Sequence, residues 1–572
     1  MTVTVARPVQ SKRTNGQRHA LFATAHMRLM MLMLLFAAGV MLVIGRLGML
    51  AVMTTGGAAR TSVLAVPPRG DIVDRNGAPL ARTIDAWTIA VHPKKLIGDP
   101  TDIAQKLAEL MPDRGDQPTF YRLLTSGRNF AYLQRRASPA LVEAVNAIGE
   151  PAIVFDRETQ RLYPQSSLAA HALGFLSTDG HGMSGMERVL DDRLTNPALN
   201  GAPVALSIDT RVQAAMESEL GRAMNTFSAR GGGGIVLDVA TGEVIAMVSL
   251  PTFNPNRVGM AGSEQLRNVT TQSVFELGST FKPITMATAM DTGVVTSMAR
   301  RFDATHPLQV GGYTIHDERG DPKRWLNMAE TLIYSSNIAT ARVADEVGPQ
   351  RMQTMFRKLG FDTKPDIELR EKGGPLWPKY WARTTTMTTA YGHGIAVTPL
   401  HLASAYAALV NGGIWRPATL LKVAPGHAPK GRRVISEQTS ARMRQMLRLI
   451  VQRGTGRKGD APGYRVGGKT GTAEAAVAGG YDRSRNVATF AAAFPMDAPR
   501  YVVLAMLDSP LGTKETFGWK TAAWNTAPVV GRTIARVGAM LGVVPQERQD
   551  IDVSDILPTL WQDPSVKPAT GN

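Results

Sequence analysis

The sequence predicts an α+β protein made of a membrane-spanning helix, a supporting domain and a larger domain with one sheet. Three observations lead to this fold class. An apolar run follows a basic N-terminus, residues 54–203 mix short strand and helix patterns, and strands flank a long helical stretch within residues 204–547. A length of 572 residues suggests several domains rather than one.

The composition favours a partner at the cell envelope. The formal net charge is +17 and the pI is about 10.1, which suits anionic lipid, phosphate-bearing substrates or nucleic acid. Because no nucleic-acid module or dense basic helix is recognisable, we expect no nucleic-acid partner and favour a membrane partner. The chain has no cysteine, which excludes disulfides, thiolate metal sites, a catalytic cysteine and a lipoprotein anchor.

The N-terminus is predicted to be a cytoplasmic tail, residues 1–28, followed by a transmembrane helix, residues 29–53. The tail is basic and no acidic residue precedes Asp71, so we expect the N-terminus to stay in the cytoplasm. The next residues are apolar or small except for Arg46, which we expect to reach the outer headgroups. A cleaved signal peptide is the alternative. The apolar run is long, however, and no clear small-residue cleavage site follows it directly.

Two segments flank the larger domain. Residues 54–203, which begin with a linker over residues 54–66, contain no evident pair of nucleophile and base, so their charged residues are expected to form internal salt bridges and turns. The charged stretches are Arg69–Gly77, Arg161–Pro164 and Gly182–Glu187. Residues 548–572 are polar with several prolines, which predicts a flexible tail.

The start of the larger domain, residues 204–547, has clear local signals. Val204–Ile208 has the pattern of a strand, and Asp209 can cap the helix that follows. Two further strand patterns flank Ala240-Thr241-Gly242 and indicate a hairpin: Ile235–Asp238 and Glu243–Leu250.

The stretch Glu276–Pro283 is the first candidate for chemistry. Ser279 and Lys282 stand three residues apart, so they share one face of a helix. Since Pro283 is accommodated only near a helix start, the helix should begin close to Ser279, and Gly293 can end it. A hydroxyl at the positive end of a helix with an amine one turn away is a nucleophile beside a candidate base. Taken alone, the same pattern also fits a capping serine and a solvated lysine.

Two later motifs favour the nucleophile. Ser335-Ser336-Asn337 lies between two helical runs, Met328–Tyr334 and Ile338–Glu346, where a loop would present a hydroxyl and a carboxamide. Lys469-Thr470-Gly471-Thr472 follows a predicted strand, Tyr464–Val466; the glycine would let a ligand backbone approach, while the lysine and threonines bind a carboxylate. Ser-x-x-Lys, Ser-x-Asn and Lys-Thr-Gly in this order are typical of penicillin-binding proteins and serine β-lactamases.

On these motifs the chain resembles a class B penicillin-binding protein, most closely the division-specific, FtsI-like peptidoglycan D,D-transpeptidases. Arg69–Gly77 and Gly182–Glu187 look like the pedestal motifs of that class, which soluble β-lactamases lack, and Tyr391–Gly394 with Val397–Leu400 also look like the family. The resemblance implies an elongated α+β pedestal domain over residues 54–203, then a β-lactamase-like transpeptidase domain with an antiparallel sheet and helices.

Two positions depart from the family pattern. The family usually has proline before Gly278-Ser279, where this chain has Leu277. The glycine-rich turn late in the domain is altered at Ala522-Ala523-Trp524, which bears on the shape of that edge of the site.

The resemblance also implies a role for each motif residue. Ser279 would attack the carbonyl of the penultimate D-alanine of a stem peptide and Lys282 would take its proton, after which a second stem amine would resolve the acyl-enzyme. Ser335 would pass a proton to the leaving amine, and Asn337 would hold the backbone amide of the donor. The backbone N–H groups of Ser279 and Thr472 would form the oxyanion hole. Lys469 would complete the catalytic set and, with the threonines, bind the terminal carboxylate; the substrate-binding residues would be Ser336, Thr470, Gly471 and Thr472.

The implied partners are stem peptides with D-Ala-D-Ala ends, β-lactam antibiotics, membrane lipid, a polytopic FtsW-like septal glycosyltransferase and other divisome proteins. No metal or organic cofactor is implied. The implied location is the septal region of the bacterial inner membrane, with one span and the catalytic domain in the periplasm. Three alternatives stay open: an elongation-specific transpeptidase, a membrane-bound β-lactam sensor, and an idle scaffold. The short cytoplasmic segment disfavours the sensor, and the intact motifs disfavour the scaffold.

Gly463–Thr470 also matches the phosphate-loop pattern Gly-x-x-x-x-Gly-Lys-Thr. A phosphate loop needs a strand before its first glycine and a helix that opens at its lysine. Here Gly459–Pro462 precede the pattern and small residues follow it, so we predict no nucleotide site.

Overall fold

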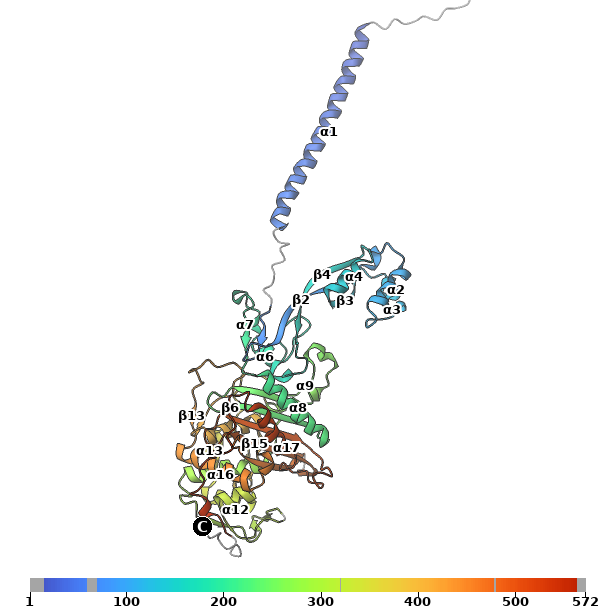
Figure 1. Cartoon of the computed structure of the whole chain (residues 1–572). Helices are drawn as coiled ribbons and strands as arrows, with labels where there is room; N and C mark the ends of the chain where they lie inside the picture. The colour runs from blue at the N-terminus through green and yellow to red at the C-terminus, as the bar shows by residue number, and fades with distance from the viewer. Residues whose placement is uncertain (1–14, 59–68, 319, 478–479, 563–572) are drawn as a thin grey trace, which may run out of the picture. The chain divides into compact units, whose positions relative to one another are not determined.

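The computed structural model describes residues 15–58, 69–318, 320–477 and 480–562, in two separate units (Figure 1). In the first unit, helix α1 spans Asn15–Ala58. Its stretch His26–Met49 is long and apolar enough to cross a membrane, with a mean hydropathy of 2.4, as the prediction for residues 29–53 requires. The predicted linker 54–66 starts inside α1, and its remainder lies outside the described residues.

The second unit starts at Arg69, and its first part, the pedestal, is built on a long two-stranded ribbon. Strand β2 (Pro79–Val91) pairs antiparallel with β4 (Ile153–Leu162), and β3 (Ala131–Ala137) joins the Val91 end of β2. Three helices share a small apolar core with these strands: α2 (Pro100–Leu110), α3 (Gln117–Leu124) and α4 (Pro139–Asn146).

The base of the pedestal is continuous with the larger domain. Strand β1 (Ile72–Val73) pairs with β2 on one side and, in parallel, with β5 (Val204–Ala205) on the other. One hydrophobic core therefore runs across the predicted boundary at residue 204. Three short helices complete the base: α5 (Ala170–Leu173), α6 (Gly185–Val189) and α7 (Asp191–Leu194).

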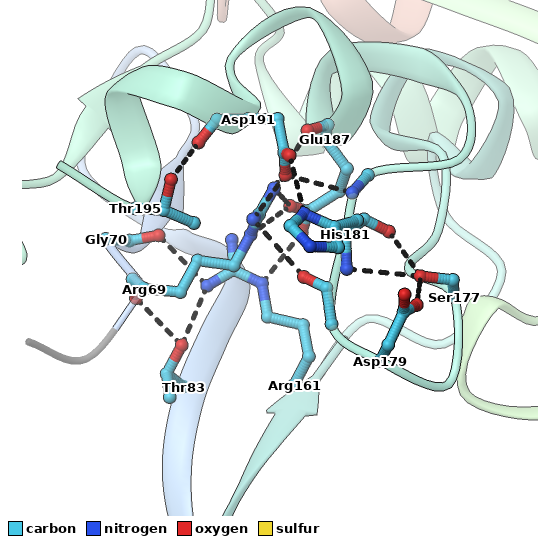
Figure 2. Close-up of polar contacts among 12 residues, drawn as sticks. Arg69, Gly70, Thr83, Arg161, Ser177, Asp179, His181, Glu187, Asp191 and Thr195 are labelled. Carbon is cyan, nitrogen blue, oxygen red and sulfur yellow. Dashed lines mark hydrogen bonds and ion pairs between the residues drawn. The ribbon is translucent and has the colours of Figure 1, made fainter. Parts of the chain in front are cut away.

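The charged stretches of the pedestal form internal salt bridges, as the sequence predicts, and these meet in one buried cluster (Figure 2). The fully buried Glu187 accepts hydrogen bonds from Arg69 Nε at 2.8 Å and from Arg161 Nε at 2.7 Å, one on each carboxylate oxygen. Arg69 also donates to Asp191 at 2.6 Å, and Arg161 donates to the Gly70 carbonyl at 2.9 Å. The cluster ties the start of the pedestal to the end of β4 and to α6.

The larger domain is organised around a five-stranded antiparallel sheet in the order β14-β15-β16-β6-β7. Along β6, β15 and β16, alternate side chains face opposite cores. The strands are β6 (Gly231–Asp238), β7 (Val244–Leu250), β14 (Gly467–Val477), β15 (Gly480–Phe494) and β16 (Tyr501–Asp508). The predicted hairpin is confirmed by β6 and β7, and Asp209 caps α8 as expected.

Helices cover both faces of this sheet. On one face lie α8 (Thr210–Thr226) and α17 (Thr526–Val537), and on the other α15 (Pro399–Val410) and α16 (Glu437–Arg453). The region between β7 and α15 is mainly helical, with α9 (Ser263–Leu266), α10 (Lys282–Asp291), α11 (Met328–Tyr334), α12 (Asn337–Val347), α13 (Pro349–Lys358) and α14 (Arg383–Thr389). The remaining short strands are β8 (Arg301–Asp303), β9 (Leu308–Val310), β10 (Tyr313–Ile315), β11 (Trp325–Asn327), β12 (Ile414–Trp415) and β13 (Arg432–Arg433).

The C-terminal segment differs from the flexible tail that the sequence predicts for residues 548–572. Its described part is docked as a strap, Asp550–Trp561, on α16 and α11. Arg448 of α16 donates to Asp550 at 2.8 Å, and Arg442 forms an ion pair with Asp555. At α11, Asn327 donates to the Thr559 carbonyl at 2.8 Å. Long-range ion pairs, which local composition does not reveal, hold this segment in place; residues 563–572 lie outside the described residues.

The buried cluster gives the first testable prediction. Glu187→Gln keeps the shape of the side chain but leaves Arg69 and Arg161 buried without their shared counter-charge. We expect a loss of about 3 kcal/mol or more in the free energy of unfolding, visible as a lower melting temperature. Glu346→Gln is the control, because it removes an ion pair with Arg300 whose side chains are 40% and 42% exposed, worth less than about 1 kcal/mol. Equal melting temperatures of the two variants would contradict the prediction.

Candidate active site

Ser279 lies in a tight turn that leads into a helix. The 3₁₀ turn Gly278–Phe281 runs directly into α10, which starts at Lys282 with Pro283 at its second position. A helix starting close to Ser279 is therefore confirmed, although Ser279 itself belongs to the turn. Its side chain is half-buried, and among the described residues its hydroxyl forms no hydrogen bond. The backbone of Ser279 is thus fixed by the turn, and its hydroxyl is not used in a hydrogen bond by the described part of the fold.

Two lysines converge on the hydroxyl of Ser335. The Nζ of Lys282 donates to Ser335 Oγ at 3.1 Å and also contacts the Ser335 carbonyl oxygen. The Nζ of Lys469 donates to the same Oγ at 3.0 Å and to the Thr470 carbonyl at 3.0 Å. Both lysine side chains are fully buried. Three motifs far apart in the sequence are therefore joined at one oxygen atom.

Burial shifts the protonation of both lysines. It lowers the pKa of Lys282 to about 8, while Asp317, Glu318 and Asp321 act in the opposite direction. The pKa of Lys469 is held well below its usual range, first by burial and then by the charge of Lys282. Two ammonium groups close together in a buried site disfavour each other, so each lysine makes the charged form of the other less favourable.

The loop between α11 and α12 presents the second motif. Ser335 ends α11 in a left-handed conformation with φ of +62°, which is costly for a residue other than glycine and persists only where neighbours impose it. Asn337 opens α12, and its Nδ2 donates to the His316 carbonyl at 3.0 Å. The half-buried Ser335 and Asn337 are thus fixed side by side.

Ser336 has a different place from the substrate-binding role that the sequence predicts. Its side chain is fully buried, and its hydroxyl accepts from the Ala339 N–H at 3.0 Å as the cap of α12. It also donates to Asp317 Oδ2 at 2.6 Å. Since both functions of the hydroxyl are used by the fold, Ser336 stabilises the loop and is not free to bind a ligand.

The third motif lies inside a strand, so the predicted strand Tyr464–Val466 is wrong. β14 begins at Gly467 and contains Lys469–Thr472, while Arg465 adopts φ of +50°, which breaks an extended run. β14 is the end strand of its sheet, so it can offer an edge to an extended ligand. Lys469 opens no helix, which is incompatible with a phosphate loop at Gly463–Thr470.

Glycines let β14 approach the Ser279 turn. A Cβ at Gly471 would lie 2.3 Å from the Leu277 carbonyl oxygen, and one at Gly278 would lie 2.8 Å from the Thr472 carbonyl oxygen. Gly278 also adopts φ of +55°. The backbones around Ser279 and Thr472, whose N–H groups the sequence predicts as an oxyanion hole, therefore lie next to each other.

The threonines of the third motif have partners outside it. Thr470 and Thr455 share a hydrogen bond between their hydroxyls at 2.7 Å. The hydroxyl of Thr472 accepts from the Ala522 N–H at 3.1 Å, so the altered turn at Ala522–Trp524 still reaches the site through its backbone.

Three residues next to the motifs were not predicted as site residues. Asp317 holds Ser336, Thr455 holds Thr470, and Glu276 accepts from the Gly394 N–H at 3.0 Å and from the Tyr481 hydroxyl at 3.1 Å. Asp317 and Thr455 come from loops without a fixed spacing to their motifs, so no sequence pattern pointed to them, whereas Glu276 stands three residues before Ser279 in the first candidate stretch. Within the described residues, no group of three or more His, Asp or Glu side chains is arranged to hold a metal ion.

Two models of known protein families match this chain. The family model of the penicillin-binding protein transpeptidase domain matches residues 232–527, and that of the penicillin-binding protein dimerisation domain matches residues 64–196. These ranges correspond to the domain with the two lysines and to the pedestal.

Curated relatives and solved structures point to the same proteins. A probable peptidoglycan D,D-transpeptidase FtsI from Caulobacter vibrioides is 41% identical over 489 residues, which cover 83% of this chain and 82% of the relative. The peptidoglycan D,D-transpeptidase FtsI of Escherichia coli is 29% identical and covers 83% of this chain and 84% of its own length. The crystal structure of penicillin-binding protein 3 from Mycobacterium tuberculosis complexed with ampicillin matches with a TM-score of 0.66 at 29% identity, over 84% of this chain and 97% of that one.

The close approach at Gly471 can be tested by adding one carbon. Gly471→Ala places a methyl group 2.3 Å from the Leu277 carbonyl oxygen, so β14 must move away from the Ser279 turn. We expect a loss of about 1–3 kcal/mol in the free energy of unfolding, measured in denaturant. Gly374→Ala is the control, because nothing lies within 4 Å of its added carbon. A parental stability for Gly471→Ala would show that the two segments can separate freely.

Proposed function

The chain belongs to the class B penicillin-binding proteins and is an FtsI-like peptidoglycan D,D-transpeptidase, and we propose that it cross-links stem peptides at the division septum through an acyl-enzyme on Ser279. The observation that carries the proposal is the Ser335 hydroxyl held between Lys282 and Lys469, beside the turn of Ser279. This arrangement supplies a nucleophile, a base and a route for the proton.

Acylation follows from how the hydrogen bonds are distributed. A neutral Lys282 amine has two N–H groups and one lone pair, and its two contacts to Ser335 use the N–H groups. The lone pair is then free to take the proton of Ser279 as its oxygen attacks the carbonyl of the penultimate D-alanine. The bond to the terminal D-alanine breaks, and its nitrogen needs a proton.

Ser335 is suited to deliver that proton. Its oxygen already accepts from both lysines, so its own hydrogen has to point away from them, toward a ligand in the site. The proton taken by Lys282 replaces the one that Ser335 gives to the leaving amine. The amine of a second stem peptide then attacks the acyl-enzyme, and the same groups work in the reverse direction.

Lys469, Thr470 and Thr472 are proposed to bind the terminal carboxylate, with Gly471 giving room for the donor backbone and Asn337 holding its amide. A carboxylate beside Lys469 would favour its ammonium form, because an opposite charge counteracts the burial that lowers its pKa. The backbone N–H groups of Ser279 and Thr472 are proposed to bind the oxyanion, which typically contributes about 3–4 kcal/mol per donor.

The location and partners extend the proposal. A basic tail before α1 favours an N-terminus in the cytoplasm, with the pedestal and transpeptidase domain in the periplasm. The FtsI relatives support a peptidoglycan D,D-transpeptidase, and we propose that it acts at the septum with an FtsW-like glycosyltransferase and other divisome proteins. The ampicillin complex of the Mycobacterium tuberculosis protein supports β-lactams as ligands that acylate Ser279.

Acylation by a penicillin tests the roles of Ser279 and Lys282. The full chain in detergent should be labelled by a fluorescent penicillin at a rate that rises with pH through about 8, the pKa of Lys282, because only the neutral amine accepts a proton. Lys282→Arg should acylate at least about 1,000-fold more slowly, since a guanidinium does not deprotonate. Stopped-flow fluorescence from pH 5 to pH 10 measures both rates.

Ser279→Ala is the control and should take no label, with a melting temperature close to that of the parent. If Lys282→Arg acylates within tenfold of the parent and with the same pH profile, another group takes the proton.

The division role has its own test in cells. Depletion of the protein should block septation while cells continue to elongate or branch, because the cross-links of the septum are missing. Light microscopy with a fluorescent D-amino acid follows new wall. Rounded cells with normal septa would instead indicate the elongation-specific transpeptidase.

A further inference from the structure

A short segment outside the three motifs holds the Ser335–Asn337 loop. This segment, His316-Asp317, follows β10 and faces the start of α12. The two carboxylate oxygens of Asp317 accept from Ser336 Oγ at 2.6 Å and from the Ile338 N–H at 2.9 Å. The preceding His316 carbonyl accepts from Asn337 Nδ2 at 3.0 Å. Each of the three residues after Ser335 is therefore bonded to this dipeptide.

These contacts determine what the loop can present to a substrate. Ser335 adopts φ of +62°, which needs constraint from both neighbouring helices. The bond to His316 fixes the orientation of the Asn337 carboxamide, so that its oxygen and its second N–H remain for a ligand. Without the carboxylate, the buried Ser336 hydroxyl and the Ile338 N–H would lose their partner, which is unfavourable for this arrangement of the loop.

The charge of Asp317 also acts on Lys282. It favours the ammonium form of Lys282, against the effect of burial. The charged and titratable groups that face Lys282 come from three places: Lys469 on β14, His393 before α15, and Asp317, Glu318 and Asp321 after β10. Within this set, Asp317 is the group that also bonds directly to the Ser335–Asn337 loop.

We propose that Asp317 is a positioning residue of the transpeptidase: its carboxylate holds the Ser335–Asn337 loop in its reactive arrangement, and its negative charge sets the pH range in which the site works. The proposal rests on the proposed acylation of Ser279 and adds a residue outside the three motifs. Asp317 acts through Ser336, Asn337 and Lys282, and need not touch the substrate.

Two substitutions separate the contacts from the charge. Asp317→Ala removes both, and penicillin acylation of the full chain at pH 8 should slow by about 100-fold, the effect of a small misplacement of reacting groups. Asp317→Asn keeps the shape and part of the hydrogen bonding but removes the charge. Because that charge favours the ammonium form, its loss should move the rising limb of the pH profile to lower pH.

Glu318→Gln is the matched control. It removes a neighbouring carboxylate that also acts on Lys282, but among the described residues its side chain makes no hydrogen bond. We expect the rising limb of the pH profile of Glu318→Gln to move less than that of Asp317→Asn. Its maximal acylation rate should stay within twofold of that of the parent. A merely structural residue would lower the melting temperature without moving the limb.

Failure of the inference about Asp317 can be distinguished from failure of the proposed function. If the parent is acylated at Ser279 but Asp317→Ala and Asp317→Asn both acylate within threefold of it with an unmoved limb, the inference about Asp317 is wrong. If Asp317→Ala does not fold, the test is the pH profile of Asp317→Asn. A rising limb that moves to lower pH supports the inference, and an unmoved limb overturns it. If the parent itself is not acylated, the proposed function fails instead.

Discussion

The structure of the active site depends on keeping two lysine amines out of water and around one hydroxyl. Lys282 and Lys469 are fully buried, and both donate to Ser335 Oγ. An isolated ammonium in such a place would be strongly disfavoured. Nearby oxygen atoms must therefore accept its hydrogen bonds, and the pKa of the amine is lowered. The same burial that makes the site costly to fold lowers the pKa of Lys282 to about 8. Stability and reactivity are therefore set by one group of contacts.

The fold meets this constraint by bringing together segments that are distant in sequence. Lys282 is fixed at the start of α10, Ser335 at the junction of α11 and α12, and Lys469 within the end strand β14. Small residues let these segments approach: Gly471 and Gly278 bring β14 against the serine turn. The pedestal uses the opposite solution for buried charge, since the carboxylates of Glu187 and Asp191 pair with the guanidinium groups of Arg69 and Arg161. By contrast, neither buried lysine of the site forms a salt bridge among the described residues, and both donate to a neutral hydroxyl.

Much of this could be predicted because the motifs are local. Ser279 and Lys282 share one turn, and the loop of Ser335 is bounded by helical patterns, so sequence spacing carried the information. Two predictions failed because of long-range contacts. Nothing local indicates that Asp317 approaches Ser336, or that Arg448 binds Asp550 and holds the strap. Ser336 was misjudged because its helix-capping function cannot be distinguished from ligand binding by sequence. The strand after Tyr464 was misplaced because Arg465 takes a left-handed conformation.

The strap and the sheet together have a consequence for biosynthesis. Strand β6 completes its pairing only with β16, which is made much later, and the strap that reaches α11 comes near the end of the chain. A ribosome delivers the N-terminal residues first, so β6 and β7 wait with an open apolar edge while most of the domain is still missing. An unpaired strand edge can pair with other chains, so aggregation is favoured during this interval. The two lysines also come together only after β14 has been made, because Lys469 follows Lys282 and Ser335 in the chain.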